Sequence, residues 1–179
     1  MFQGGNGEIN NTHTLRDKCA WWEVDLGRAA TIETIKIFNR EDGALAKHVA
    51  QDMFSSRLPP FYVMVSTIPY GDGTGEESLS SSLGSSVRFK RFAVNQREYL
   101  WTLPVRTVGR YVRIQLDGKE EYLHLAQVQV FGSWGDVPKG KPVGTVTAGR
   151  DVTVVTIQPE TDPEYVSGCR HELALLPVL

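Results

Sequence analysis

The chain contains little cysteine, because Cys19 and Cys169 are the two that occur among its 179 residues. At most one intramolecular disulfide can form, so the cysteine count does not decide between a reducing and an oxidising compartment. A zinc site built on cysteine thiolates is also disfavoured, since such sites usually need more than two of these ligands.

Long hydrophobic runs and an excess of charge of one sign are also missing. No apolar stretch approaches the roughly 20 residues that cross a bilayer, and Met1 is not followed by a basic and then an apolar segment. The formal net charge of -2 shows no basic excess for nucleic acid. We therefore expect no signal peptide in the chain as given and no nucleic-acid partner.

Motifs of common catalytic sites are absent as well. The sequence has no Gly-x-Ser-x-Gly, no His-Glu-x-x-His, no phosphate-binding loop and no dinucleotide fingerprint. Its acidic residues are not paired in a way that suggests glycosidic chemistry. We expect a protein that is not an enzyme.

The chain does contain many segments in which apolar and polar residues alternate. In one of them Trp22, Val24 and Leu26 share a face, and Val112, Ile114 and Leu116 do so in another. Such alternation predicts strands over 21–26, 31–38, 61–67, 87–93, 98–103, 110–116 and 124–131. The sequence thus predicts an all-β domain with an antiparallel core.

Two connections and the C-terminal part look different from these strands. Residues 71–86 are rich in Gly and Ser, which predicts a surface loop, whereas 44–54 could form a short helix that Pro59 and Pro60 end. We expect one domain over 1–133, a linker over 134–143 and an extension over 144–179. Within the extension, 144–157 predicts a hairpin that has to dock elsewhere, and the tail carries no motif that we can interpret.

Four ordered blocks carry a resemblance to a known family: WWEVDLG from Trp21, IKIFNR from Ile35, GRYVRIQL from Gly109 and LHLAQVQVFG from Leu123. In these blocks the chain resembles the coagulation-factor C-type (discoidin) and fucolectin families. The resemblance implies an antiparallel jelly-roll β-sandwich of the galactose-binding-like type, which carries its ligands on loops at one end. It also implies an extracellular or cell-surface protein.

The resemblance begins after the first strand of the family, since Gly4-Gly5-Asn6 stands where the family has an Asp-Gly-Asn turn. We therefore expect the N-terminal strand to be lacking. A missing outer strand leaves backbone groups unpaired, and we rank a fragment of a longer protein first as the explanation. An isolated exon product and a C-terminal hairpin that fills the gap are the alternatives.

The resemblance further implies a sugar-binding site, in which a loop histidine and an Arg-x-Asp motif hold a fucose-like sugar. His13, Arg40 and Asp42 match these positions, with Asp42 orienting a basic neighbour. For the second basic residue, Lys47 has the spacing of the family and Arg57 has its local context, which we favour slightly. The partner expected is a glycan on a glycoprotein or a polysaccharide, and cationic donors suit its hydroxyl groups.

This sequence departs from the fucolectin pattern at two places. Gly43 and Ala44 replace the adjacent cysteines that often contact the sugar, and acidic calcium ligands are missing. Oxygen atoms near Asn6, Asn10 and Gln127 could still form a weak structural calcium site.

Other side chains lead to alternative readings of the same loops. Met53 and Phe54 could instead dip into a phospholipid surface beside basic residues, as in some discoidin domains, and a protein-binding adhesion module is a third reading. We expect a structural role for His124, and half-buried packing for Trp21, Tyr111 and Tyr122.

Overall fold

The computed structural model describes residues 12–40, 54–134, 144–148, 151–155 and 171–177, with side chains for 14–40 and 54–134. In chain order its elements are β1 (Thr12–His13), β2 (Asp17–Lys18), β3 (Trp21–Phe38), the 3-10 turn η2 (Ser55–Arg57), β4 (Phe61–Ser66), α1 (Gly75–Ser85), β5 (Arg88–Phe92), β6 (Glu98–Thr102), β7 (Val108–Leu116), β8 (Glu120–Glu121), β9 (His124–Leu125), β10 (Gln127–Ser133), β11 (Gly144–Ala148), β12 (Asp151–Val155) and β13 (His171–Pro177). The linker expected over 134–143, apart from its first residue, and most of the helix expected over 44–54 lie outside the described residues.

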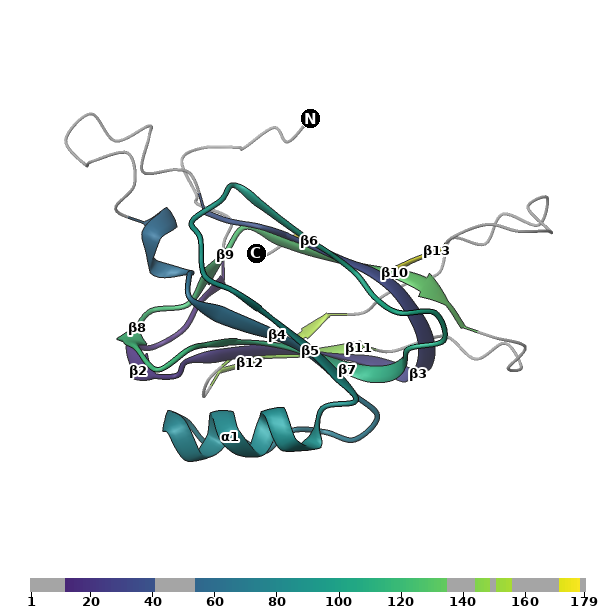
Figure 1. Cartoon of the computed structure of the whole chain (residues 1–179), viewed down its shortest axis with the longest axis horizontal. Helices are drawn as coiled ribbons and strands as arrows, with labels where there is room; N and C mark the ends of the chain where they lie inside the picture. The colour runs from purple at the N-terminus through teal and green to yellow at the C-terminus, as the bar shows by residue number, and fades with distance from the viewer. Residues whose placement is uncertain (1–11, 41–53, 135–143, 149–150, 156–170, 178–179) are drawn as a thin grey trace.

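Nine of the described strands form one antiparallel network that is folded into two layers (Figure 1). One layer has the order β12-β11-β3-β7-β4-β5, and the other is formed by β13, β10, the second half of β3 and β6. The expected antiparallel β-sandwich with a C-terminal β extension is therefore confirmed.

Strand β3 belongs to both layers, because it bends between them. Its first half pairs with β7 and β11, and its second half pairs with β6 and β10. The register with β7 shifts between Asp25 and Ala30, and Gly27 in this bend has a φ of 82° that favours glycine. The two strands expected over 21–26 and 31–38 are thus two halves of one strand, which is a correction to the sequence analysis.

The core lies between the two layers and follows the alternation of the sequence. Trp22, Val24 and Leu26 are fully buried, and they pack with Val112 and Ile114 from the neighbouring β7. Since each fully buried side chain of this size contributes about 1.5–3 kcal/mol relative to exposure, this core dominates the stability of the sandwich.

Helix α1 replaces the surface loop expected over 71–86, and that prediction was wrong. The helix covers the outer face of the first layer (Figure 1), where Leu79 packs in a cluster with Met64 and Tyr111. Trp21 on that face is 1% exposed, not half-buried as expected, and its Nε1 donates to the Gly73 carbonyl at 2.9 Å. Contacts to the helix and to the segment just before it stabilise a Gly- and Ser-rich helix that its own composition does not favour.

The C-terminal extension adds strands to both layers. The expected hairpin is present as β11 and β12, and β11 pairs with the first half of β3 opposite Trp22–Asp25. The tail, which carries no recognisable motif, forms β13 and pairs with β10. Backbone groups at two strand edges are thereby satisfied.

Within the described part of the chain, no helix has the length and hydrophobicity that crossing a lipid bilayer requires.

Candidate functional site

Four segments that are distant in the sequence meet at one end of the sandwich, on the left in Figure 1. They are β1, the end of β3 with Arg40, the η2 turn with Phe54 before it, and the stretch from β8 to β9. Short strands and turns of this kind at the end of a rigid sandwich commonly position binding residues.

Arg40 contacts His124 at the centre of this region. Arg40 Nη1 lies 3.2 Å from His124 Nδ1, and the His124 side chain is buried. A guanidinium has only donors, so Nδ1 accepts and the proton of the neutral imidazole is on Nε2. This contact adds a positioning role to the structural role expected for His124.

His13 is placed next to the same histidine by strand pairing. In the antiparallel pair of β1 and β9, His13 stands opposite His124. Residues opposite each other in such a pair have Cβ atoms about 4.5–5.5 Å apart. The backbone of one predicted site residue thus lies beside the histidine that contacts another.

Aromatic rings adjoin both arginines of the site. The Arg40 Cζ atom is 4.2 Å from the centroid of the Phe54 ring, and the Arg57 Cζ atom is 5.1 Å from the same ring. Arg57 also lies over Tyr122, with its Cζ atom 5.4 Å from that ring. Cation–π contacts of this kind orient the guanidinium groups, and both arginines are partly exposed. Tyr122 therefore contacts a site arginine, besides the packing expected for it.

Asn39 anchors the end of β3, which carries Arg40. The buried Asn39 side chain donates through Nδ2 to the Ser55 carbonyl at 2.9 Å, with Asn95 Oδ1 and the Gln96 carbonyl each at 3.1 Å. Its Oδ1 accepts from the Arg40 backbone N–H at 2.9 Å. The residue before Arg40 is therefore a support of the site that the sequence motif did not indicate.

The remaining predicted site residues are only partly described. Asp42 and Lys47 lie outside the described residues, so the choice between Lys47 and Arg57 as the second basic residue stays open. Arg57 does contact the same Phe54 ring as Arg40. Asn6 and Asn10 also lie outside, and Gln127 stands at the start of β10 opposite Phe38.

A metal site finds no support in the described side chains. Among them no group of three or more His, Cys, Asp and Glu residues could hold a metal ion. The calcium site expected near Asn6, Asn10 and Gln127 stays a prediction.

The structure also describes one of the two residues of the membrane hypothesis. Met53 lies outside the described residues, but Phe54 is partly buried and faces two guanidinium groups. These contacts occupy part of the ring that would have to enter a lipid surface.

Solved structures that are similar to this chain include lectin domains. The lectin domain of Lectinolysin complexed with Lewis B antigen is 29% identical and has a TM-score of 0.50, over 69% of this chain and 72% of that chain. A histidine mutant of that domain complexed with Lewis b gives the same identity and TM-score, over 69% and 71%. A fucose binding module from Streptococcus pneumoniae is 25% identical, with a TM-score of 0.48 over 70% and 79%.

The sequence comparisons give no match of their own. No protein-family model matches the chain. No curated protein sequence matches it either. The Lectinolysin domain confirms the expected likeness to the F-type lectin and discoidin-like fold, which is the class that this sandwich defines.

Proposed function

We propose that this chain is a non-catalytic carbohydrate-binding module that recognises a fucose-like sugar at the end of the sandwich. Arg40 and Arg57 are the main donors, and His13 contributes from β1. The observation that carries the proposal is the convergence of Arg40, His124, Phe54 and Arg57 in one region. The Lectinolysin lectin domain, which was solved with Lewis b, supports a glycan as the ligand.

The chemistry of this cluster suits a neutral sugar. Guanidinium groups donate strong hydrogen bonds to hydroxyl and ring oxygens without requiring a charged ligand. Phe54 and Tyr122 add apolar surface beside these donors. Because His124 and Phe54 fix Arg40 before the sugar arrives, less side-chain entropy is lost on binding.

The proposal includes a setting for the module. The ligand is a glycan on a glycoprotein or a polysaccharide, met outside the cell or at its surface. A weak calcium site at Asn6, Asn10 and Gln127 would be structural, since oxygen ligands of this kind suit Ca²⁺. A single shallow site binds weakly, so multivalent presentation strengthens the interaction.

A glycan array tests the proposal with four proteins: the unmodified chain, Arg40→Ala, Arg57→Ala and the control Arg88→Ala. Arg88 is exposed on β5 and takes no part in the site, so its variant controls for the loss of one surface arginine. We expect the unmodified chain and Arg88→Ala to bind fucosylated glycans. Arg40→Ala should lose at least about tenfold in affinity, as a hydrogen bond to a charged group is worth about 1.5–3 kcal/mol.

The array is repeated with a chelator to test the calcium proposal. If the chelator does not change glycan binding, calcium is not required for binding, and the proposed sugar site is unaffected by this result. Fucose binding retained by Arg40→Ala, or by a His13→Ala variant, would contradict the site.

A further inference from the structure

Strand β5 lies at the end of the first layer, and among the described strands it pairs with β4 alone. One side of its backbone therefore presents N–H and C=O groups that no described strand pairs with. A strand of five residues is about 17 Å long, which is enough to pair with an extended segment of similar length. The β5 edge thus has the geometry for the addition of a further strand.

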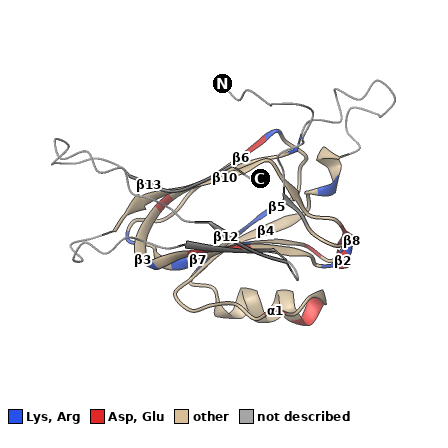
Figure 2. Ribbon diagram, turned by 180° about the vertical axis from the view of Figure 1, so that it is seen from behind, with Lys and Arg blue, Asp and Glu red and all other residues tan. Residues whose placement is uncertain are grey.

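The sequence of β5, Arg-Phe-Lys-Arg-Phe, combines three cations with two aromatic rings. Figure 2 shows the blue of lysine and arginine along this strand. Arg91 forms an ion pair with Asp117 at 2.6 Å, whereas Arg88 Nη1 and Lys90 Nζ donate to backbone carbonyls at 2.8 and 3.4 Å. Among the described residues, no carboxylate forms an ion pair with Arg88 or Lys90. The edge therefore carries positive charge that is not neutralised locally.

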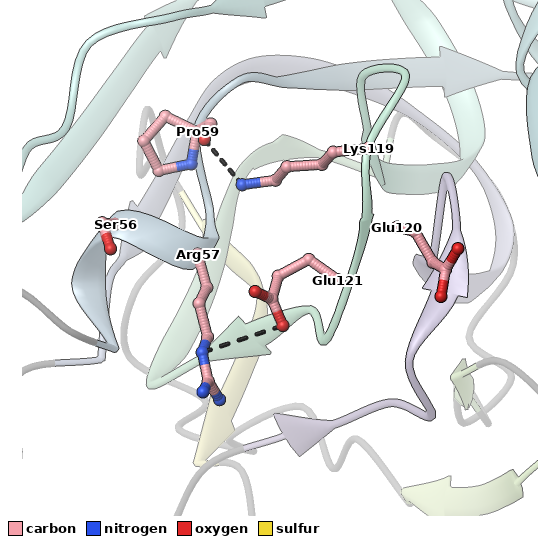
Figure 3. Close-up of a pocket in the computed structure, with 6 residues that line it drawn as sticks. All are labelled: Ser56, Arg57, Pro59, Lys119, Glu120 and Glu121. Carbon is pink, nitrogen blue, oxygen red and sulfur yellow. Dashed lines mark hydrogen bonds and ion pairs between the residues drawn. The ribbon is translucent and has the colours of Figure 1, made fainter.

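The cavity beside the candidate site contains charges of both signs (Figure 3). Arg57 Nε lies 3.8 Å from Glu121 Oε1, and Lys119 Nζ donates to the Pro59 carbonyl at 2.6 Å. Glu120 adds a second carboxylate to the lining. An anionic partner would meet repulsion there, whereas the β5 edge attracts it.

Alternate side chains of β5 point to opposite faces, so an added strand meets two different surfaces. Arg88 and Lys90 share one face with Phe92, whose ring packs against the core. Phe89 lies on the other face, where its ring is 6.1 Å from that of Tyr62 between centroids and the residue is 53% exposed. A strand that alternates carboxylates with β-branched apolar residues matches both surfaces.

A second copy of the same strand is a poor occupant of this edge. Two β5 strands paired antiparallel about their centres would place the two Lys90 side chains directly opposite each other. Like charges in that position are destabilising, and lysine on an edge strand commonly prevents self-association. The occupant is therefore a different, acidic chain.

We propose that the β5 edge is a docking site for an acidic extended segment of a partner protein, which adds to the first layer as a further strand. Its carboxylates pair with Arg88 and Lys90 on one face, and its apolar side chains pack against Phe89 on the other. Backbone hydrogen bonds supply affinity, and the alternation of charged and apolar side chains supplies specificity. The proposal does not depend on the sugar site, because His13, Arg40 and Arg57 lie outside β5.

Fluorescence polarisation with a fluorescein-labelled Glu-Val-Glu-Val-Glu peptide at low salt tests this inference. The test variants are Lys90→Glu and Phe89→Ser. Their matched controls are Arg106→Glu, which reverses an exposed charge in the turn between β6 and β7, and Val105→Ser, which replaces an apolar residue that is 92% exposed. A Lys-Val-Lys-Val-Lys peptide is the charge-reversed probe, and heparin represents an anionic polysaccharide.

We expect the acidic peptide to bind Lys90→Glu at least about fivefold and Phe89→Ser at least about threefold more weakly than the unmodified chain, with both controls within about twofold. The charge-reversed peptide should not bind. Saturating acidic peptide should slow amide hydrogen exchange in 88–92, because the outward N–H groups become hydrogen-bonded. Unchanged exchange, or undiminished peptide binding by folded Lys90→Glu, overturns the proposal. Binding of heparin without binding of the peptide also overturns it and assigns the edge to an anionic polysaccharide.

Discussion

Replacing Arg113 by methionine should destabilise the fold strongly, because this arginine is fully buried beneath α1. Its Nε donates to Glu23 Oε2 at 2.9 Å, its Nη1 to Ser82 Oγ at 3.2 Å and its Nη2 to the Gly71 carbonyl at 2.9 Å. Its Cζ atom also lies 3.9 Å from the Trp21 ring. Arg113→Met leaves a buried carboxylate without its cation.

The expected loss of stability depends on pH, because a protonated Glu23 is neutral and no longer needs a counter-ion. Removing one partner of a buried ion pair costs about 3–5 kcal/mol when the other stays charged. Burial already raises the pKa of Glu23 to about 7, against an ordinary value of 4.5, although Arg113 opposes this shift. Because the pKa of Glu23 is higher in the folded state than in the unfolded state, this carboxyl group contributes stability that is fully present below about pH 4.5. That contribution is lost as the pH rises through about 7. Without Arg113 the pKa of Glu23 should rise further.

Urea unfolding followed by tryptophan fluorescence at pH 5 and pH 8 measures this effect. We expect Arg113→Met to lose about 3–5 kcal/mol at pH 8. At pH 5 the carboxyl is neutral, and we expect a loss nearer 1–3 kcal/mol from the missing hydrogen bonds. The double variant Glu23→Leu with Arg113→Met should recover most of the loss at pH 8. A loss below about 1 kcal/mol at pH 8, or the same loss at both pH values, would show that Glu23 is not left as a buried carboxylate without a counter-ion.

Three further predictions concern packing, sheet edges and the second basic residue. Gly109→Ala should lower the free energy of unfolding by about 1–3 kcal/mol, because the added Cβ would overlap a valine of β4. Gly84→Ala on α1 is the control, because its Cβ would point into open space, and it should raise the free energy of unfolding by up to about 1 kcal/mol. Thermal or urea unfolding measures both changes. Truncation after residue 134 removes β11 and β13 and leaves the strand edges that they cover on β3 and β10 unpaired. Unpaired edges promote association, so size-exclusion chromatography should show a concentration-dependent increase in size. A truncated protein that stays monomeric with an unchanged unfolding midpoint would contradict this. Calorimetry with methyl α-L-fucoside should show at least tenfold weaker binding by Arg57→Ala and little change for Lys47→Ala, and the reverse order would assign the role to Lys47.

The strands could be predicted because burial between two layers imposes a period of two on the sequence. Trp22 and Val24 in β3, and Val112 and Ile114 in β7, follow this period and are buried. Helix α1 could not be predicted in the same way, since Arg113, which donates to Ser82 of the helix, and the residues that pack against Leu79 come from distant strands. Composition alone therefore favours a loop where tertiary contacts form a helix.

The candidate site was only partly accessible to sequence reasoning. His13 and Arg40 were found through a family motif, because both stand close to a strand whose pattern is easily recognised. The contact between Arg40 and His124 joins residues 84 positions apart. The contacts of Phe54 with the guanidinium groups of Arg40 and Arg57 likewise form only when the chain is folded, so the local sequence carries no signal for them.

The proposed site places a fucose-like sugar between Arg40 and Arg57. An NMR titration with methyl α-L-fucoside tests it directly, by following the arginine Nε–Hε signals and the His124 ring signals. We expect saturable shifts at Arg40, Arg57 and His124 and none at Arg88, which is exposed on β5. Saturable shifts elsewhere with none at Arg40 would contradict it.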